Sequence, residues 1–158
     1  MKNLTNIFIS VFYTGYFKIW PGTFATLISI LILFPIIKLN VVSFTIFLSI
    51  FFLVSMLSIY FIKKYSFDTN SHDSGVIVID EFLGIFLILI FYEYIFFYSD
   101  LITLLLIFIL FRFFDITKIY PANIIDKKMK NSLGVLLDDF VASIYTITIM
   151  YMINVIIY

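Results

Sequence analysis

Several residue types on which enzymes commonly depend are missing or scarce in this chain of 158 residues. Cysteine is absent, which excludes disulfide bonds, thiolate metal sites and cysteine-based phosphatase chemistry. Histidine occurs once, at His72, which excludes zinc sites with several histidines and the two-histidine arrangement of some lipid phosphatases. The net charge is zero, so the chain lacks the basic field that nucleic-acid binding requires, and we expect no nucleic-acid partner.

Apolar residues, by contrast, are abundant. Hydrophobic side chains make up 63% of the sequence and aromatic ones 21%. Soluble folds contain roughly 45–50% apolar residues, so a chain of this length has more apolar surface than a soluble core could bury. The composition therefore predicts an integral membrane protein in contact with the lipid bilayer, built as a single domain over residues 1–158.

Five apolar blocks predict an all-α, polytopic bundle of about five transmembrane helices. They cover residues 24–37, 41–62, 76–98, 101–114 and 141–158. The blocks 24–37 and 101–114 are short compared with the roughly 20 residues that cross the hydrocarbon layer. We expect these two to be tilted, lengthened by flanking polar residues, or re-entrant. The interrupted apolar run over residues 4–16 predicts an interfacial helix before the bundle.

The basic residues predict the orientation of the bundle. If each block crosses once, nine of the ten lysines and arginines share one side and only Lys38 lies on the other. The positive-inside tendency then places the N-terminus and the loops 63–80 and 115–139 in the cytoplasm. The same topology brings Asp80 and Glu81 to the membrane face that carries Asp115.

Nine of the twenty charged side chains lie between residues 111 and 140, bounded by apolar blocks. If residues 112–118 are helical, Arg112, Asp115 and Lys118 lie on one face, one turn apart. Such a face suits a phosphate held near a metal ion. The alternative is that Arg112 and Lys118 anchor a helix end by reaching toward anionic lipid.

Carboxylates gather at the same predicted interface, each expected at a helix end: Asp80, Glu81, Asp115, Asp138 and Asp139. Acids at helix ends can simply cap and solvate them. Five on one face would repel one another without cations, and such oxygen ligands suit Mg²⁺. The adjacent His72 and Asp73 alone are too few for a histidine–aspartate metal site. Lys127, Lys128 and Lys130 form a small basic patch that can attract anionic headgroups.

Three segments resemble the phosphatidylglycerophosphatase A family: WPGTFATL at 20–27, HDSGVIVIDEFLG at 72–84, and FRFFDITKIYP with DKKMKNSLGVLLDDFVAS between 111 and 143. The resemblance implies a Mg²⁺-dependent enzyme of the bacterial inner membrane, with its active site on the cytoplasmic face. Its substrate would be phosphatidylglycerophosphate, and its product phosphatidylglycerol. The family's acidic motif residues fall on Asp80, Glu81, Asp115, Asp126, Asp138 and Asp139, and its basic ones on Arg112 and Lys118.

The sequence departs from the family pattern at several backbone-determining positions. Ile119 replaces a proline, Asn131 and Ser132 replace two glycines, and two further changes lie in the first segment, at residues 17–18 and 25–26. None of these changes removes a candidate ligand. Asn and Ser adopt positive φ less readily than glycine, so the changes bear on the geometry of residues 119–134.

The mechanism expected from these residues is phosphomonoester hydrolysis. The five carboxylates would hold one or two Mg²⁺ ions, and Arg112 and Lys118 would bind the phosphate. Attack by an activated water and an aspartyl-phosphate route both stay open, as do the identity of the general base and the oligomeric state. The rival classes are a small ion or proton transporter, expected to carry carboxylates near mid-helix, and a non-enzymatic membrane subunit.

Overall fold

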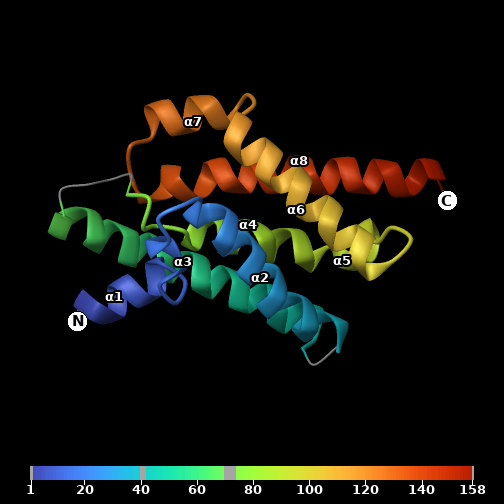
Figure 1. Ribbon diagram of the computed structural model, residues 1–158, viewed down its shortest axis with the longest axis horizontal. Coiled ribbons are helices and arrows are strands. Elements are labelled where there is room, and N and C mark those ends of the chain that lie inside the picture. The colour runs from blue at the N-terminus through green and yellow to red at the C-terminus, as the bar shows by residue number, and fades with distance from the viewer. Residues whose placement is uncertain (1, 40–41, 70–73, 158) are drawn as a thin grey trace.

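A computed structural model describes residues 2–39, 42–69 and 74–157 (Figure 1). Within these ranges every regular element is helical and no strand occurs, which confirms the all-α class. His72 and Asp73 lie outside the described residues. The elements are α1 (Lys2–Ile9), the 3₁₀ turn η1 (Thr14–Tyr16), α2 (Pro21–Lys38), α3 (Phe44–Thr69), α4 (Ile79–Ile90), α5 (Tyr92–Ile95), α6 (Asp100–Thr117), α7 (Ala122–Lys128) and α8 (Ser132–Ile157).

Three helices of the described chain, α2, α3 and α8, are long and apolar enough to cross a membrane. The two blocks predicted to be short lengthen by taking in flanking residues, and α2 and α6 each reach 18 residues. Of the helices that arise from the five apolar blocks, apart from the four-residue α5, the shortest is α4 in block 76–98, which has 12 residues and spans about 18 Å. It ends at Ile90 and the four-residue α5 follows, so this block is broken near Phe91.

The N-terminal segment is helical over a shorter range than predicted. The predicted interfacial helix covered residues 4–16, but α1 ends at Ile9, and residues 11–13 have positive φ. The chain turns here because it packs closely on the segment before α4. A Cβ on Gly15 would lie 2.1 Å from the carbonyl oxygen of Val76, and the amide of Val78 donates to the carbonyl of Ile9 at 3.0 Å. The N-terminal segment thus holds residues 76–78 in place.

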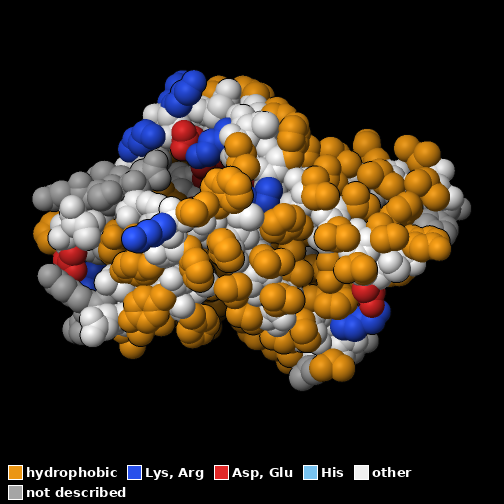
Figure 2. Space-filling view, viewed as in Figure 1, with side chains coloured by type: hydrophobic (Ala, Val, Ile, Leu, Met, Phe, Trp, Pro, Cys, Tyr) orange, Lys and Arg blue, Asp and Glu red, His pale blue; other side chains and the backbone are white. Residues whose placement is uncertain are grey.

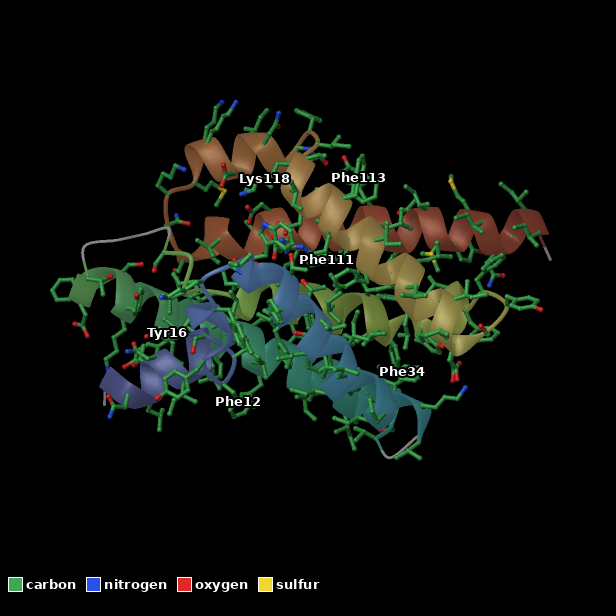
Figure 3. The ribbon with its side chains drawn as sticks, viewed as in Figure 1. Phe12, Tyr16, Phe34, Phe111, Phe113 and Lys118 are labelled. Atoms are coloured by element: carbon green, nitrogen blue, oxygen red, sulfur yellow. The ribbon has the colours of Figure 1, made fainter. Side chains whose placement is uncertain are left out.

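Helix α4 is the buried centre of the bundle and packs most extensively against α8 and α2. The close approach depends on Gly84, where a Cβ would lie 2.7 Å from the ring of Phe111 on α6 (Phe111 is labelled in Figure 3). The hydroxyl of Ser143 on α8 lies 3.0 Å from the carbonyl oxygen of Gly84 and 2.7 Å from that of Asp139. This contact fixes α4 against α8 one turn away from Asp80 and Asp139.

The outer surface of the bundle is largely apolar, as Figure 2 shows, and it includes many exposed aromatic and aliphatic side chains. This surface suits contact with lipid. At one end, Lys38 at the close of α2 and Asp100 at the start of α6 form an ion pair of 2.8 Å. Lys38 and Asp100 therefore share one end of the bundle, as the predicted topology requires.

Candidate functional site

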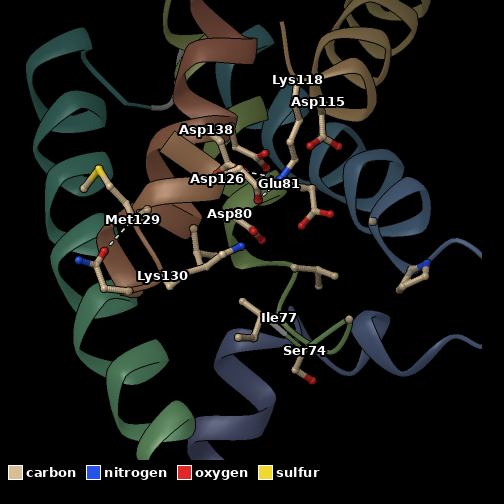
Figure 4. Close-up of a pocket in the computed structure, with 18 residues that line it drawn as sticks. Ser74, Ile77, Asp80, Glu81, Asp115, Lys118, Asp126, Met129, Lys130 and Asp138 are labelled. Carbon is tan, nitrogen blue, oxygen red and sulfur yellow. Dashed lines mark hydrogen bonds and ion pairs between the residues drawn. The ribbon is translucent and has the colours of Figure 1, made fainter. Parts of the chain in front are cut away.

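A cavity of about 210 Å³ lies at the opposite end of the bundle, where the predicted acids converge (Figure 4). Its wall is built by the first turns of α2, α4 and α8, the segment that leads into α4, the end of α6, and α7 with its connection to α8. The lining residues that bear on function are Gly22, Asp80, Glu81, Asp115, Lys118, Asp126, Lys130, Asn131, Asp138 and Asp139. The structure therefore gathers all five predicted carboxylates and Lys118 in one wall.

Three of these acids, Asp80, Glu81 and Asp139, form a group that we call the acidic trio. Each offers an oxygen that lies within 4.8 Å of the oxygens of the other two. One buried oxygen of each, Oδ1 of Asp80, Oε2 of Glu81 and Oδ2 of Asp139, has no hydrogen-bond partner in the described part of the chain. Unpaired buried carboxylate oxygens are costly. The trio is therefore the part of the site that could hold a cation.

Of the three residues predicted to share one face of α6, only Arg112 and Asp115 do so. Arg112 and Asp115 lie one turn apart as expected, and Nη1 of Arg112 is 2.6 Å from Oδ2 of Asp115. The same Nη1 lies 3.7 Å from Oε1 of Glu81. Arg112 is mostly buried and is absent from the described lining of the cavity. It therefore positions and partly neutralises Glu81 from behind the cavity wall.

Lys118 departs from the predicted face. Helix α6 ends at Thr117, and Lys118 takes a left-handed conformation with φ of 43°, so the prediction that it shares a helical face with Arg112 is wrong. Its ammonium instead lies 2.6 Å from Asp126 and 2.7 Å from Asp138 (Figure 4). Burial acts to lower the pKa of Lys118, but these two hydrogen bonds outweigh burial and raise the pKa above its ordinary value. Lys118 is thus firmly charged and joins α7 to α8.

Asp138 and Asp139 also differ from their predicted place at a helix end. Helix α8 begins at Ser132, so both acids lie well inside it, about 9 Å along its axis. The helix starts early because the side chain of Asn131 accepts a hydrogen bond from the amide of Gly134 at 2.9 Å, which is the bond of an N-terminal cap. Consequently Asp138 turns to Lys118 while Asp139 joins Asp80 and Glu81, as side chains on successive helical positions diverge.

Sequence reasoning missed the role of Gly22. Helix α2 starts at Pro21, directly after Trp20, so Gly22 lies in its first turn. A Cβ on Gly22 would lie 2.1 Å from Oε1 of Glu81 and 3.0 Å from Nη1 of Arg112. Only a residue without a side chain lets α2 approach this ion pair. The sequence motif contains this glycine, but nothing in it indicates that Glu81, 59 positions later, packs against it.

The fold and the site together define a helical membrane protein with a buried acidic site at one end of its bundle. Comparison with known proteins identifies the family. The model of the phosphatidylglycerophosphatase A family matches residues 7–154. The chain is 34% identical over 139 residues to phosphatidylglycerophosphatase A of Haemophilus influenzae, which covers 85% of this chain and 78% of that protein.

A second relative is phosphatidylglycerophosphatase A of Escherichia coli. It is 27% identical over 156 residues, covering 98% of this chain and 86% of that protein. No solved structure matches the chain. The chain belongs to the phosphatidylglycerophosphatase A family and is a phosphatase, which confirms the resemblance seen in its three motif segments.

Proposed function

We propose that this protein is a Mg²⁺-dependent enzyme that removes the terminal phosphate of phosphatidylglycerophosphate, giving phosphatidylglycerol and inorganic phosphate. Family membership supports the reaction, because both relatives carry the name of this activity. The observation that carries the proposal is the acidic trio, three close carboxylates with unpartnered buried oxygens in the wall of a cavity. Carboxylates are costly to bury in a membrane protein, so a cluster of three without a functional role would be selected against.

The trio fits a Mg²⁺ ion by the chemistry of its donors. Mg²⁺ prefers oxygen ligands and is commonly held by one or two carboxylates together with water and substrate phosphate. Asp80, Glu81 and Asp139 would hold it, while Asp115 and Asp138 support the site through their ion pairs with Arg112 and Lys118. When bound, Mg²⁺ supplies charge neutralisation and polarises the phosphate oxygens.

The protein side chains supply the remaining requirements of phosphate-ester hydrolysis. Lys118 lies in the cavity wall and can bind a phosphate oxygen, while Arg112 fixes Glu81 and Asp115. In the water route, the water oxygen attacks phosphorus, a carboxylate takes the water proton, and the bond from phosphorus to the glycerol oxygen breaks. The leaving glycerol oxygen then takes up a proton. In the rival route an aspartate oxygen attacks phosphorus, the bond to the glycerol oxygen breaks and that oxygen takes up a proton. Water then cleaves the acyl phosphate to free the aspartate and release inorganic phosphate.

The placement of the acids favours the enzyme over the transporter alternative. Asp80 and Glu81 lie in the first turn of α4, and Asp138 and Asp139 lie in the second turn of α8. Beyond these positions the remaining lengths of α4 and α8 contain no further acid within residues 82–90 and 140–157. A proton or ion pathway would need polar groups farther across the bilayer.

The decisive assay uses the protein purified in detergent and phosphatidylglycerophosphate in mixed micelles. Phosphate release should require Mg²⁺, stop with EDTA and return when Mg²⁺ is restored. A protein with the catalytic Asp80→Asn substitution, prepared in parallel, controls for contaminating phosphatases. Absence of Mg²⁺-dependent release from a folded, monodisperse preparation would refute the proposed reaction.

We further propose that the protein lies in the bacterial inner membrane with the cavity on the cytoplasmic side. The support is the sequence distribution of lysines and arginines, in which nine of ten are expected on one side, together with the pairing of the tenth, Lys38, with Asp100. Because the native chain has no cysteine, single cysteines report topology cleanly. A cysteine at Lys128 should resist an impermeant thiol reagent added to intact cells, whereas one at Asp100 should react. The reverse pattern would invert the orientation.

A further inference from the structure

Lys130 differs from Arg112 and Lys118, the other cations of the site, in its position and in having no ion pair within the described residues. It lies in the short connection between α7 and α8, and it belongs to the residues that line the cavity. Figure 4 shows its side chain extending toward the cavity from the side opposite Lys118. The neighbouring Lys127 and Lys128 occupy the last turn of α7, outside the described lining. Lys130 is therefore the lysine of the basic patch that faces the reaction space.

The charge of Lys130 is also available to a ligand. Lys118 is held between Asp126 and Asp138, and Arg112 is held by Asp115 with Glu81 nearby. Lys130 forms no ion pair within the described residues and is exposed. The pKa of Asp126 is lowered chiefly by its hydrogen bond from Lys118, and the charge of Lys130 adds a smaller contribution. A flexible, solvated ammonium at a cavity rim binds phosphate readily as a point charge.

We propose, building on the proposed function, that Lys130 binds the phosphodiester of the lipid substrate while the terminal phosphate occupies the acidic end of the cavity. The substrate carries two phosphates joined by a glycerol, so a terminal phosphate placed near the trio leaves a second anion a few bonds away. Lys130 meets that anion at the rim, where the lipid leaves the cavity. It makes the site selective for a lipid phosphomonoester that also carries a phosphodiester.

The product gives this proposal a second readout. Phosphatidylglycerol keeps the phosphodiester and lacks the terminal phosphate, so Lys130 should contribute to its binding as well. Phosphatidic acid has a phosphomonoester but no phosphodiester, since its single phosphate is attached directly to diacylglycerol. A residue specific for the phosphodiester should therefore distinguish these two lipids, whereas general attraction of anionic lipid to a basic surface should not.

The test compares Lys130→Ala with Lys130→Arg and with Lys128→Ala, a lysine two positions earlier on the outer face. All are assayed with Mg²⁺ in micelles of constant surface charge. We expect Lys130→Ala to raise the KM for phosphatidylglycerophosphate and the inhibition constant of phosphatidylglycerol by about tenfold each. The ratio of kcat/KM for phosphatidylglycerophosphate over phosphatidic acid should fall by a similar factor. Lys130→Arg should retain most of the binding, and Lys128→Ala should leave the ratio unchanged.

Equal effects of Lys130→Ala and Lys128→Ala would overturn the proposal, because they would assign both lysines to general attraction of anionic lipid. Unchanged KM and product inhibition in Lys130→Ala would overturn it too, while leaving the phosphatase reaction intact. Failure of the proposed function has a different signature, namely no phosphate release by the wild type. Native mass spectrometry of bound phosphatidylglycerol then tests Lys130 without turnover, and equal retention by wild type and Lys130→Ala would refute its role.

Discussion

The six acids around the cavity fall into two groups that differ in how their charge is balanced. Asp115, Asp126 and Asp138 each lie within 2.7 Å of a cation, either Arg112 or Lys118. The acidic trio has only the more distant contact of Glu81 with Arg112 at 3.7 Å. Each member of the trio has a buried oxygen without a partner among the described residues; Asp138 has one too, but its other oxygen is paired with Lys118. Neighbouring positions on α8 belong to different groups, so the difference comes from placement and not from residue type.

This contrast indicates a division of labour. The paired acids join elements: Asp138 and Asp126 connect α8 and α7 through Lys118, and Asp115 fixes Arg112 on α6. Removing one partner of such a pair leaves a buried charge uncompensated, which destabilises the fold. The close packing of the three trio carboxylates does not stabilise the fold, because like charges repel and burial disfavours each charged form. A cation bound among them would offset both costs.

The largest expected effect comes from neutralising the trio. Asp80→Asn and Asp139→Asn keep side-chain shape but remove an anionic ligand, so turnover should fall by more than about 100-fold and the Mg²⁺ concentration for half-maximal rate should rise. Without Mg²⁺, melting temperature should hold or increase, because carboxylate repulsion is relieved. Mg²⁺ titrations of activity and thermal unfolding in detergent measure both quantities.

The matched control for this experiment is Asp126→Asn, an equal change of charge in a paired and more exposed acid. Its turnover should fall much less, and its Mg²⁺ requirement should stay near wild type. Partial exposure screens its ion pair with Lys118, so a modest loss of stability is expected. Should Asp126→Asn shift the Mg²⁺ requirement as far as Asp139→Asn does, the two groups of acids are not functionally distinct.

A smaller effect is expected from Gly22→Ala, which disturbs the trio without changing any charge. The added methyl would lie 2.1 Å from Oε1 of Glu81, so the flexible carboxylate must move while α2 itself gains a better helix former. A ligand displaced by about 1 Å can reduce turnover by about 100-fold. Circular dichroism and melting temperature should remain near wild type. Wild-type turnover would show that Glu81 tolerates displacement and is not a close metal ligand.

The sequence predicted which acids lie together in the cavity wall. Membrane topology alone brought Asp80 and Glu81 to the face that carries Asp115, and helical spacing predicted that Arg112 and Asp115 lie one turn apart on one face. Apolar composition and the lengths of the five apolar blocks likewise predicted a helical bundle. These features depend on local spacing and on the side of the membrane to which a segment returns, and both can be read from one chain.

The division into two groups could not be predicted, since it depends on where helices stop. Lys118 leaves α6 in a left-handed conformation and meets Asp126 and Asp138, contacts that bring together residues 8 and 20 positions away. Asn131 caps α8, which begins at Ser132, six residues before Asp138, and this start turns Asp138 and Asp139 toward different partners. Long-range contacts decide such boundaries, whereas local propensity leaves them open.

Arg112→Lys tests the comparison between the two groups of acids by changing the cation that contacts both of them. Arginine reaches Asp115 closely and Glu81 more distantly through one planar group, and lysine offers only a point charge on a differently shaped stem. Because Arg112 acts behind a proposed metal ligand, we expect turnover to fall about tenfold, with a smaller change in KM. Steady-state kinetics at saturating Mg²⁺ measures both. Unchanged turnover would assign Arg112 to anchoring of the helix end.

The smallest effect is expected at the far end of the bundle, where Lys38 and Asp100 form an ion pair with no role in the cavity. Lys38→Gln removes the charge, while Asp100 keeps its hydrogen bond from the hydroxyl of Tyr92 at 2.8 Å. Lys38 is 54% exposed, so solvent screens the pair and little stability depends on it. Turnover, KM and Mg²⁺ requirement should all match wild type. A loss of activity comparable to that of Arg112→Lys would mean that the two ends of the bundle are coupled, and the acidic site could then no longer be treated as a local arrangement of residues.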